Sequence, residues 1–153
     1  MSVVVESLRV RDFRAYAQAE VRLGEGLTVI HGPNGAGKTN LLEAIYFGCT
    51  GRSCRTSDER QVVRFGAGAT RVEVRTREDT DPPTRHELFV GFQPGEAKRF
   101  KVDGAVVDRL VDNPARPLVS VFLPDRLELV KGPPALRRAH LDQVVAALWP
   151  SRA

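Results

Sequence analysis

Apolar and charged residues alternate with a period of two between residues 8 and 23, which is typical of strands that bury one face. Residues 27–31 form instead a nearly unbroken apolar run, which predicts a central parallel strand covered on both faces. Between residues 40 and 49 the apolar positions recur at helical spacing and predict a helix with one packing face. Gly51 is placed to end that helix.

The middle of the chain returns to alternation and carries three turn signals. Asp-Pro-Pro at residues 81–83 and Gln-Pro-Gly at residues 93–95 separate apolar stripes. Asp103 and Gly104 lie between two short apolar runs and form a two-residue hairpin signal. We therefore expect an antiparallel β insertion over about residues 70–107.

The last third of the chain predicts one more strand and one more helix. Residues 118–123 are an apolar run of the buried type, and Pro133 and Pro134 open a helical pattern that extends over about residues 133–148. The chain has 153 residues, 42% of them hydrophobic, and no break in composition. These features predict a single domain, residues 1–153.

The strongest chemical signal is the sequence Gly-Pro-Asn-Gly-Ala-Gly-Lys-Thr at residues 32–39, which matches the phosphate-binding loop G-x-x-x-x-G-K-[ST]. It lies between a predicted strand and a predicted helix, as that loop requires. We expect the loop and the residue that follows it to bind a nucleoside triphosphate. These residues are Gly32, Pro33, Asn34, Gly35, Ala36, Gly37, Lys38, Thr39 and Asn40.

The residue types explain the chemistry of such a loop. Glycines allow backbone conformations in which successive N–H groups converge on phosphate oxygens, and the N-terminus of the following helix adds its partial positive charge. Lys38 supplies an ammonium group for the β- and γ-phosphates, and the hydroxyl of Thr39 is placed to bind Mg²⁺.

Charge and composition limit the partners. The formal net charge of +4 favours an anionic partner beyond the nucleotide, although such an excess is also common on solvated surfaces. No apolar stretch is long enough to cross a bilayer and the first residues lack a secretion signal, so we expect a cytoplasmic protein without a membrane partner. Cys49 and Cys54 are expected to be buried or idle thiols, and the histidines supply no metal-ligand cluster.

A phosphate-binding loop needs a further carboxylate to complete its magnesium shell. Asp125 follows the predicted strand at residues 118–123, but Pro124 lies between them and Arg126 follows where a glutamate is usual. Asp125 is therefore either that carboxylate or a loop residue at a strand end. No catalytic residue is predicted within this chain.

Four blocks of the sequence resemble, in the same order, the N-terminal part of the RecF family of bacterial DNA replication and repair proteins. The blocks are residues 8–16, 32–46, 50–56 and 122–134, with Arg137, Arg138, Leu141 and Asp142 behind the last. The resemblance covers nearly the whole chain. It implies an α/β P-loop NTPase of the ABC/SMC-head type, in which a central sheet carries an inserted antiparallel β subdomain and the head is incomplete.

The resemblance also implies a function. RecF proteins are ATP-dependent DNA-binding proteins of DNA replication, recombinational repair and the SOS response, which bind single-stranded and gapped duplex DNA and act with recombination mediator proteins. ATP and Mg²⁺ would be the cofactors, and ATP would join two complete heads into a homodimer. Arg14 and Tyr16 would lie near the nucleotide, and the alternative is a solvated arginine and a core tyrosine.

The chain departs from the family pattern in two respects. Arg126 stands where an acidic residue is usual, which puts the loop that senses the γ-phosphate in doubt. The family's signature segment, strand aspartate and catalytic glutamate are expected beyond Ala153. We therefore expect a truncated head that binds ATP without efficient hydrolysis, and an ATPase only when a C-terminal half completes it.

Five basic residues are candidates for contact with DNA phosphates: Arg52, Arg55, Lys131, Arg137 and Arg138. A solvated face is the alternative for each, and Arg138 with Asp142 has the spacing of an i,i+4 ion pair. Two other functions stay open, namely a stand-alone nucleotide-binding module without turnover and a P-loop kinase of a small molecule. The sequence shows no acceptor pocket for the kinase.

Overall fold

The computed structural model describes residues 2–123 and 131–148. The chain divides into two compact units, Met1–Pro117 and Leu118–Ala153, and each unit is described by itself. No helix among the described residues is long and apolar enough to span a membrane.

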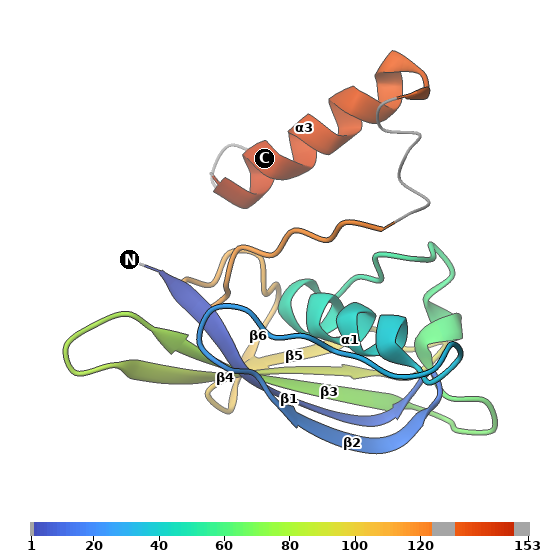
Figure 1. Cartoon of the computed structure of the whole chain (residues 1–153), viewed down its shortest axis with the longest axis horizontal. Coiled ribbons are helices and arrows are strands. Elements are labelled where there is room, and N and C mark those ends of the chain that lie inside the picture. Colours follow the sequence, from blue (N-terminus) through green and yellow to red (C-terminus); the bar gives the residue numbers. More distant parts are fainter. Residues whose placement is uncertain (1, 124–130, 149–153) are drawn as a thin grey trace. The chain divides into compact units, whose positions relative to one another are not determined.

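The first unit is built on an antiparallel sheet of six strands in the order β2-β1-β3-β4-β5-β6. One α-helix, α1 (Lys38–Thr50), lies along one face of this sheet (Figure 1), and a short 3-10 helix, η1 (Glu59–Val62), follows it. The strands are β1 (Val3–Phe13), β2 (Tyr16–Arg22), β3 (Thr70–Glu78), β4 (Thr84–Phe92), β5 (Arg99–Val102) and β6 (Ala105–Val107).

The core lies between α1 and the face of the sheet that α1 covers. Alternate residues of β1, β3 and β4 are buried there, because side chains of a strand point to opposite faces. Gly48 of α1 allows the close approach of helix and sheet, since a Cβ at this position would collide with Cγ2 of Val74 and lie 2.9 Å from Cγ1 of Val72. The fully buried apolar side chains of this core include Leu8, Val10, Phe47, Val72, Val74, Leu88 and Val90.

The predicted helix and turns are confirmed. Gly51 takes a left-handed conformation with φ 71° and caps α1, and its N–H donates to the Phe47 carbonyl. Asp103 and Gly104 connect β5 to β6 with φ of 51° and 81°, as a two-residue hairpin turn requires. The strands predicted over residues 70–107 are present, and they continue the sheet of β1 and β2 because β3 pairs with β1.

Two predicted strands are wrong. Residues 27–31 contain no strand, and the side chains of Leu27 and Val29 are 89% and 71% exposed. Residues 118–123 also contain no strand, and Phe122 is exposed. An apolar run becomes a central strand only when a neighbouring backbone satisfies its N–H and C=O groups, and neither segment pairs with a strand in the described parts of the chain.

The second unit contains the helix α3 (Pro134–Leu148), which agrees with the helix predicted over about residues 133–148. Pro133 and Pro134 open it, and the Leu136 N–H donates to the Pro133 carbonyl. Leu141, Val144 and Val145 are exposed within this unit.

Candidate nucleotide-binding site

The glycine-rich loop leads directly into the N-terminus of α1. Gly35 and Gly37 have φ of 84° and 93°, in the left-handed region that glycine adopts without strain. Gly37 is the N-cap of α1 and has no side chain to cap the helix, and the first turn contains no acidic residue. The N–H groups of this turn are therefore available to an anion, and no carboxylate of the same turn competes for them.

Lys38 and Thr39 supply the polar side chains at this helix start. The ammonium of Lys38 donates to the carbonyls of Gly32 and Pro33, each at 2.7 Å, so the side chain lies back over the loop. An ammonium carries three donors, which leaves one for a ligand. The Thr39 side chain is exposed and is free to bind a metal ion that accompanies a phosphate group.

Tyr16 packs against the end of the loop. Its hydroxyl donates to the Gly37 carbonyl at 3.2 Å, and a Cβ at Gly37 would lie 2.9 Å from the Tyr16 hydroxyl oxygen. Any other residue at Gly37 would therefore meet both a strained φ and the tyrosine ring. Tyr16 begins β2, so the phosphate-binding loop is supported by the sheet as well as by α1.

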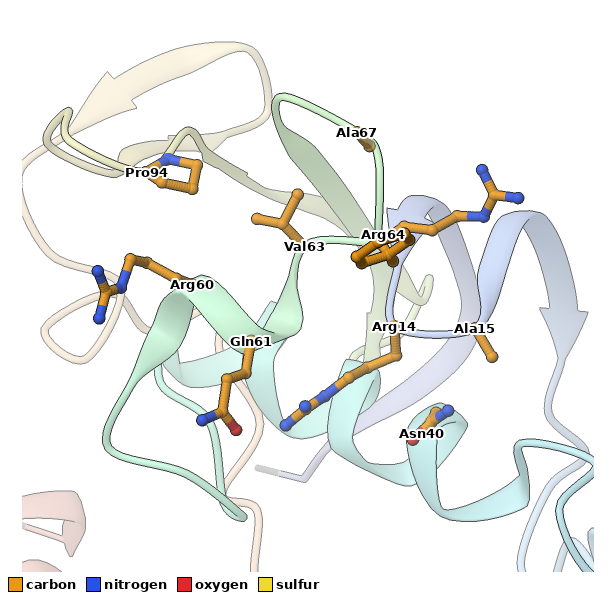
Figure 2. A pocket seen from close by; sticks show the side chains of 10 residues that line it. Arg14, Ala15, Asn40, Arg60, Gln61, Val63, Arg64, Ala67 and Pro94 are labelled. Carbon is orange, nitrogen blue, oxygen red and sulfur yellow. The ribbon is translucent and has the colours of Figure 1, made fainter.

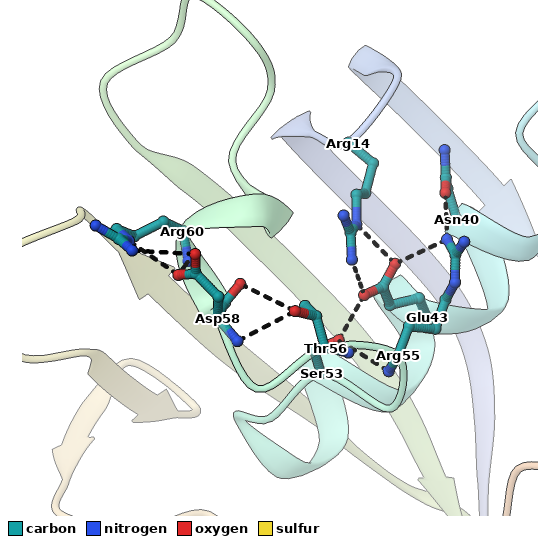
Figure 3. Close-up of polar contacts among 8 residues, drawn as sticks. All are labelled: Arg14, Asn40, Glu43, Ser53, Arg55, Thr56, Asp58 and Arg60. Carbon is teal, nitrogen blue, oxygen red and sulfur yellow. Dashed lines mark hydrogen bonds and ion pairs between the residues drawn. The ribbon is translucent and has the colours of Figure 1, made fainter.

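A buried carboxylate lies one turn further along α1 (Figure 3). Glu43 is fully buried and accepts two hydrogen bonds from the Arg14 guanidinium, at 2.8 and 2.7 Å, and a third from the Ser53 hydroxyl at 2.6 Å. Arg55 lies 3.4 Å from the same carboxylate and donates to the Asn40 side chain at 2.9 Å. Glu43 thus ties α1 to the turn between β1 and β2 and to the segment that follows α1.

An open cavity of about 560 Å³ lies beside this cluster and begins at Asn40 (Figure 2). Arg14, Arg60 and Arg64 are among its lining residues, with their guanidinium groups engaged by Glu43, Asp58 and Asp12, and Phe65 adds an apolar surface. Its size falls within the range of pockets that bind small organic ligands. The cavity is therefore large enough for part of a small organic ligand.

Local ion pairs fix part of this lining. A bidentate hydrogen bond from Arg60, at 2.8 and 3.1 Å, lowers the pKa of the Asp58 carboxyl and raises the pKa of the guanidinium. Asp58 also caps η1 by accepting from the Arg60 N–H. Within the described residues no cluster of histidine, cysteine and acidic side chains could hold a metal ion. Cys49 and Cys54 are both buried, which agrees with their interpretation as buried thiols.

The basic candidates for DNA contact are distributed over both units. Arg52 and Arg55 follow α1 in the first unit, and Arg55 is engaged with Asn40 and Glu43. In the second unit Arg137 donates to the Gly132 carbonyl at 2.9 Å. Lys131 and Arg138 are exposed.

The remaining sequence candidates are the pair Arg138 and Asp142 and the pair Asp125 and Arg126. The described residues show no ion pair between Arg138 and Asp142, so the interpretation of these two as an i,i+4 pair is not supported. Asp125 and Arg126 lie outside the described residues, and their predicted roles stay predictions.

Sequence reasoning missed the role of Glu43. A glutamate lies within the apolar face of a helix that otherwise buries Leu41, Ala44 and Phe47, and a charge at such a position indicates a buried partner. That signal was present in the spacing. The identity of the partner was not, because Arg14 is 29 positions away in sequence.

Comparison with known proteins now defines the class of protein to which this loop and helix belong. A model of the AAA domain family matches residues 7–109, and the chain belongs to this family of P-loop ATPases. The fold is also that of the SMC ATPase heads: one solved SMC ATPase superposes with a TM-score of 0.70 at 22% identity, over 92% of this chain and 98% of that one.

The particular relatives are RecF, the DNA replication and repair protein, so the resemblance to the N-terminal part of RecF is confirmed. The chain is 38% identical to RecF of Cutibacterium acnes over 97% of its own length and 38% of that protein's. It is 35% identical to RecF of Salinibacter ruber over 94% of its length and 34% of the relative's. It therefore spans little more than a third of these relatives.

A solved structure of the recombination mediator protein RecF with ATP agrees with this relationship. It superposes with a TM-score of 0.83 at 28% identity, over 95% of this chain and 40% of that chain. The predicted fold class, a P-loop head of the ABC/SMC type, is thereby confirmed.

Proposed function

We propose that this chain binds ATP with Mg²⁺ and serves DNA replication and recombinational repair as a RecF-type, ATP-dependent DNA-binding protein. The observation that carries the proposal is the glycine loop itself, because an uncapped helix N-terminus, an ammonium group and an exposed hydroxyl meet at one point. The solved RecF relative in complex with ATP supports the choice of nucleotide.

Individual residues take defined roles in this proposal. The backbone N–H groups from Gly35 to Asn40 bind the phosphates, Lys38 neutralises the β- and γ-phosphates, and Thr39 binds Mg²⁺. The cavity that begins at Asn40 offers room for the remainder of the nucleotide, and its arginines are suited to ribose and phosphate oxygens. Arg14 lines this cavity and is oriented by Glu43.

The wider function is proposed from the relatives. Single-stranded and gapped duplex DNA are the proposed nucleic-acid ligands, recombination mediator proteins the partners, and the cytoplasm and the SOS response the setting. An ATP-dependent homodimer is proposed for the complete protein. For this chain by itself we propose nucleotide binding without efficient hydrolysis, since no described carboxylate is hydrogen-bonded to Lys38 or Thr39.

The substitution Lys38→Ala tests the nucleotide site. Isothermal calorimetry with Mg²⁺ and ATP should show binding to the wild-type chain and at least a tenfold loss of affinity in the variant, because the ammonium that faces the phosphates is gone. Lys101→Ala, on the sheet face opposite α1, is the matched control and should bind ATP normally. Equal ATP affinity of Lys38→Ala and Lys101→Ala, with both variants folded by circular dichroism, contradicts the proposed site.

Phosphate release separates turnover from binding. A chain that binds ATP and releases no phosphate with or without DNA acts as a nucleotide-binding module, and steady release would show that a complete hydrolytic site is present. Transfer of the γ-phosphate to a small acceptor would support the kinase alternative instead.

A further inference from the structure

The sheet face opposite α1 carries a transverse row of arginines. Strand register places Arg11 of β1 directly beside Arg71 of β3, and Arg71 beside Gly91 of β4, which in turn lies beside Arg99 of β5. Gln18 of β2 continues the row past Arg11. The sequence neighbours Val10, Val72 and Val90 are buried on the α1 side, so the row lies on the other face of the sheet.

This row differs from the rows next to it in its charge balance. In the adjacent row Arg9 pairs with Glu73 at 3.0 Å and Glu20 at 3.6 Å. Further along the same face Arg75 pairs with Glu87 at 3.4 Å. The arginine row has no acidic member.

Within the described part of the chain, Arg11 and Arg71 form no ion pair or hydrogen bond through their guanidinium groups. Like charges directly opposite each other on neighbouring strands are destabilising. Most other arginines of the sheet form ion pairs, and Arg99 of this row pairs with the exposed Glu96 at 3.5 Å. Two adjacent arginines without a counter-ion do not help folding, and such exceptions are expected at functional positions.

An aromatic ring lies in the gap of the row. Gly91 has no side chain, and the ring of Phe89 occupies the space above it, because a Cβ at Gly91 would lie 3.1 Å from that ring. The Lys101 ammonium lies 5.6 Å from the ring centroid. Strand register pairs Phe89 with Glu73 and Lys101 in the neighbouring row, and its ring reaches over Gly91 into the gap between Arg71 and Arg99.

We propose that this row is a binding site for single-stranded nucleic acid. Arg11, Arg71 and Arg99 contact successive phosphates, and Phe89 offers a face on which one base stacks. Proteins that bind single strands combine these two elements, a positively charged track and an aromatic platform. The inference rests on the proposed DNA-binding function and assigns it to a surface distinct from the nucleotide loop and from the basic residues around α1 and α3.

The test measures binding of a fluorescent dT20 oligonucleotide to the full chain as a function of salt. Each phosphate contact to a single strand contributes about 0.7 to the slope of log affinity against log salt. The double substitution Arg11→Gln and Arg71→Gln should therefore reduce the slope by about 1.4, which corresponds to up to about a 25-fold loss at 0.1 M salt. Phe89→Ala should weaken binding about fivefold or more without changing the slope.

A charge-matched control distinguishes this site from a general effect of net charge. The double substitution Arg22→Gln and Arg109→Gln removes the same charge from other exposed positions and should leave binding of dT20 within about twofold of the wild type. An equal loss in both double variants overturns the proposal, and so does a 20-base-pair duplex that competes as well as dT20.

Calorimetry with Mg²⁺ and ATP keeps the two proposals separate. The Arg11/Arg71 variant should retain its ATP affinity, which also shows that it is folded. Binding of dT20 that is unchanged by this variant removes the site but leaves the DNA-binding function in place. A wild-type chain that binds ATP and not dT20 overturns the site and the DNA-binding part of the proposed function, while the nucleotide site stands.

Discussion

Replacement of Glu43 is expected to destabilise the first unit more than any exposed charge does. The carboxylate is fully buried, while its main partner, Arg14, has a side chain that is 18% exposed. Glu43→Ala leaves that guanidinium without its counter-ion in a largely dry site, and breaking a buried pair in this way costs about 3–5 kcal/mol. At roughly 2–4 °C per kcal/mol for a chain of this size, the melting temperature should fall by roughly 6–20 °C.

Two further variants grade this effect. Glu43→Gln keeps the shape of the side chain and some of its hydrogen bonds, so its cost should be lower, about 1.5–3 kcal/mol. Arg55→Ala removes a partner at 3.4 Å whose side chain is 38% exposed, and should cost at most about 1 kcal/mol. The expected order of stability is therefore Arg55→Ala above Glu43→Gln above Glu43→Ala.

Urea unfolding followed by circular dichroism measures these differences. Glu20→Ala is the matched control, since Glu20 is a half-exposed carboxylate whose arginine partner lies at 3.6 Å, and it should change stability by less than about 1 kcal/mol. The reasoning is refuted if Glu43→Ala and Glu20→Ala unfold at the same urea concentration. That result would mean that the buried Glu43 carboxylate does not stabilise the contact of α1 with the β1–β2 turn and with the segment after α1.

Three other predictions concern packing, a thiol and pH. Gly48→Ala should cost about 1–3 kcal/mol in urea unfolding because its Cβ meets β3, and Gly68→Ala, which meets nothing within 4 Å, should be neutral. Burial raises the pKa of the Cys49 thiol to about 12, so mass spectrometry should find it unalkylated by iodoacetamide at neutral pH in folded protein, and rapid alkylation would contradict its burial. Partial burial acts to raise the pKa of Asp103, but hydrogen bonds from the His86 ring and a backbone amide outweigh it and hold that pKa below its usual value. The resulting stabilisation is present above about pH 4 and is lost as the pH falls through the folded pKa. Asp103→Asn should therefore make the melting temperature depend less on pH below about pH 4, and an unchanged pH dependence would contradict this prediction.

The elements that the sequence predicted correctly are those whose causes are local. The glycine loop, α1 with its Gly51 cap and the Asp103-Gly104 hairpin each depend on a few neighbouring residues. Their backbone torsions are set by the residue types themselves, so a single sequence is enough to place them.

The features that the sequence did not predict depend on distant partners. An apolar run at residues 27–31 predicts a buried strand only if a second backbone lies beside it, and the run itself contains no information about that neighbour. The bond between Glu43 and Arg14 and the alignment of Arg11 with Arg71 are likewise consequences of register between segments far apart in sequence. Such features are decided by which distant segments pair, and the alternation of apolar and polar residues within one segment does not reveal its partner.

The two segments that flank the glycine loop are held very differently, although Lys38 bonds back to the Gly32 and Pro33 carbonyls within the loop. Downstream of the loop, α1 is packed on the sheet. Upstream of it, the backbone of residues 27–31 forms no hydrogen bond to the backbone of any described residue. Amide hydrogens upstream of Gly32 should therefore exchange with solvent long before those inside α1. If a partner orders residues 27–31 in the conformation that binds phosphate, the affinity of the loop for phosphate will rise. By thermodynamic linkage, bound phosphate will then raise the affinity for that partner by the same factor.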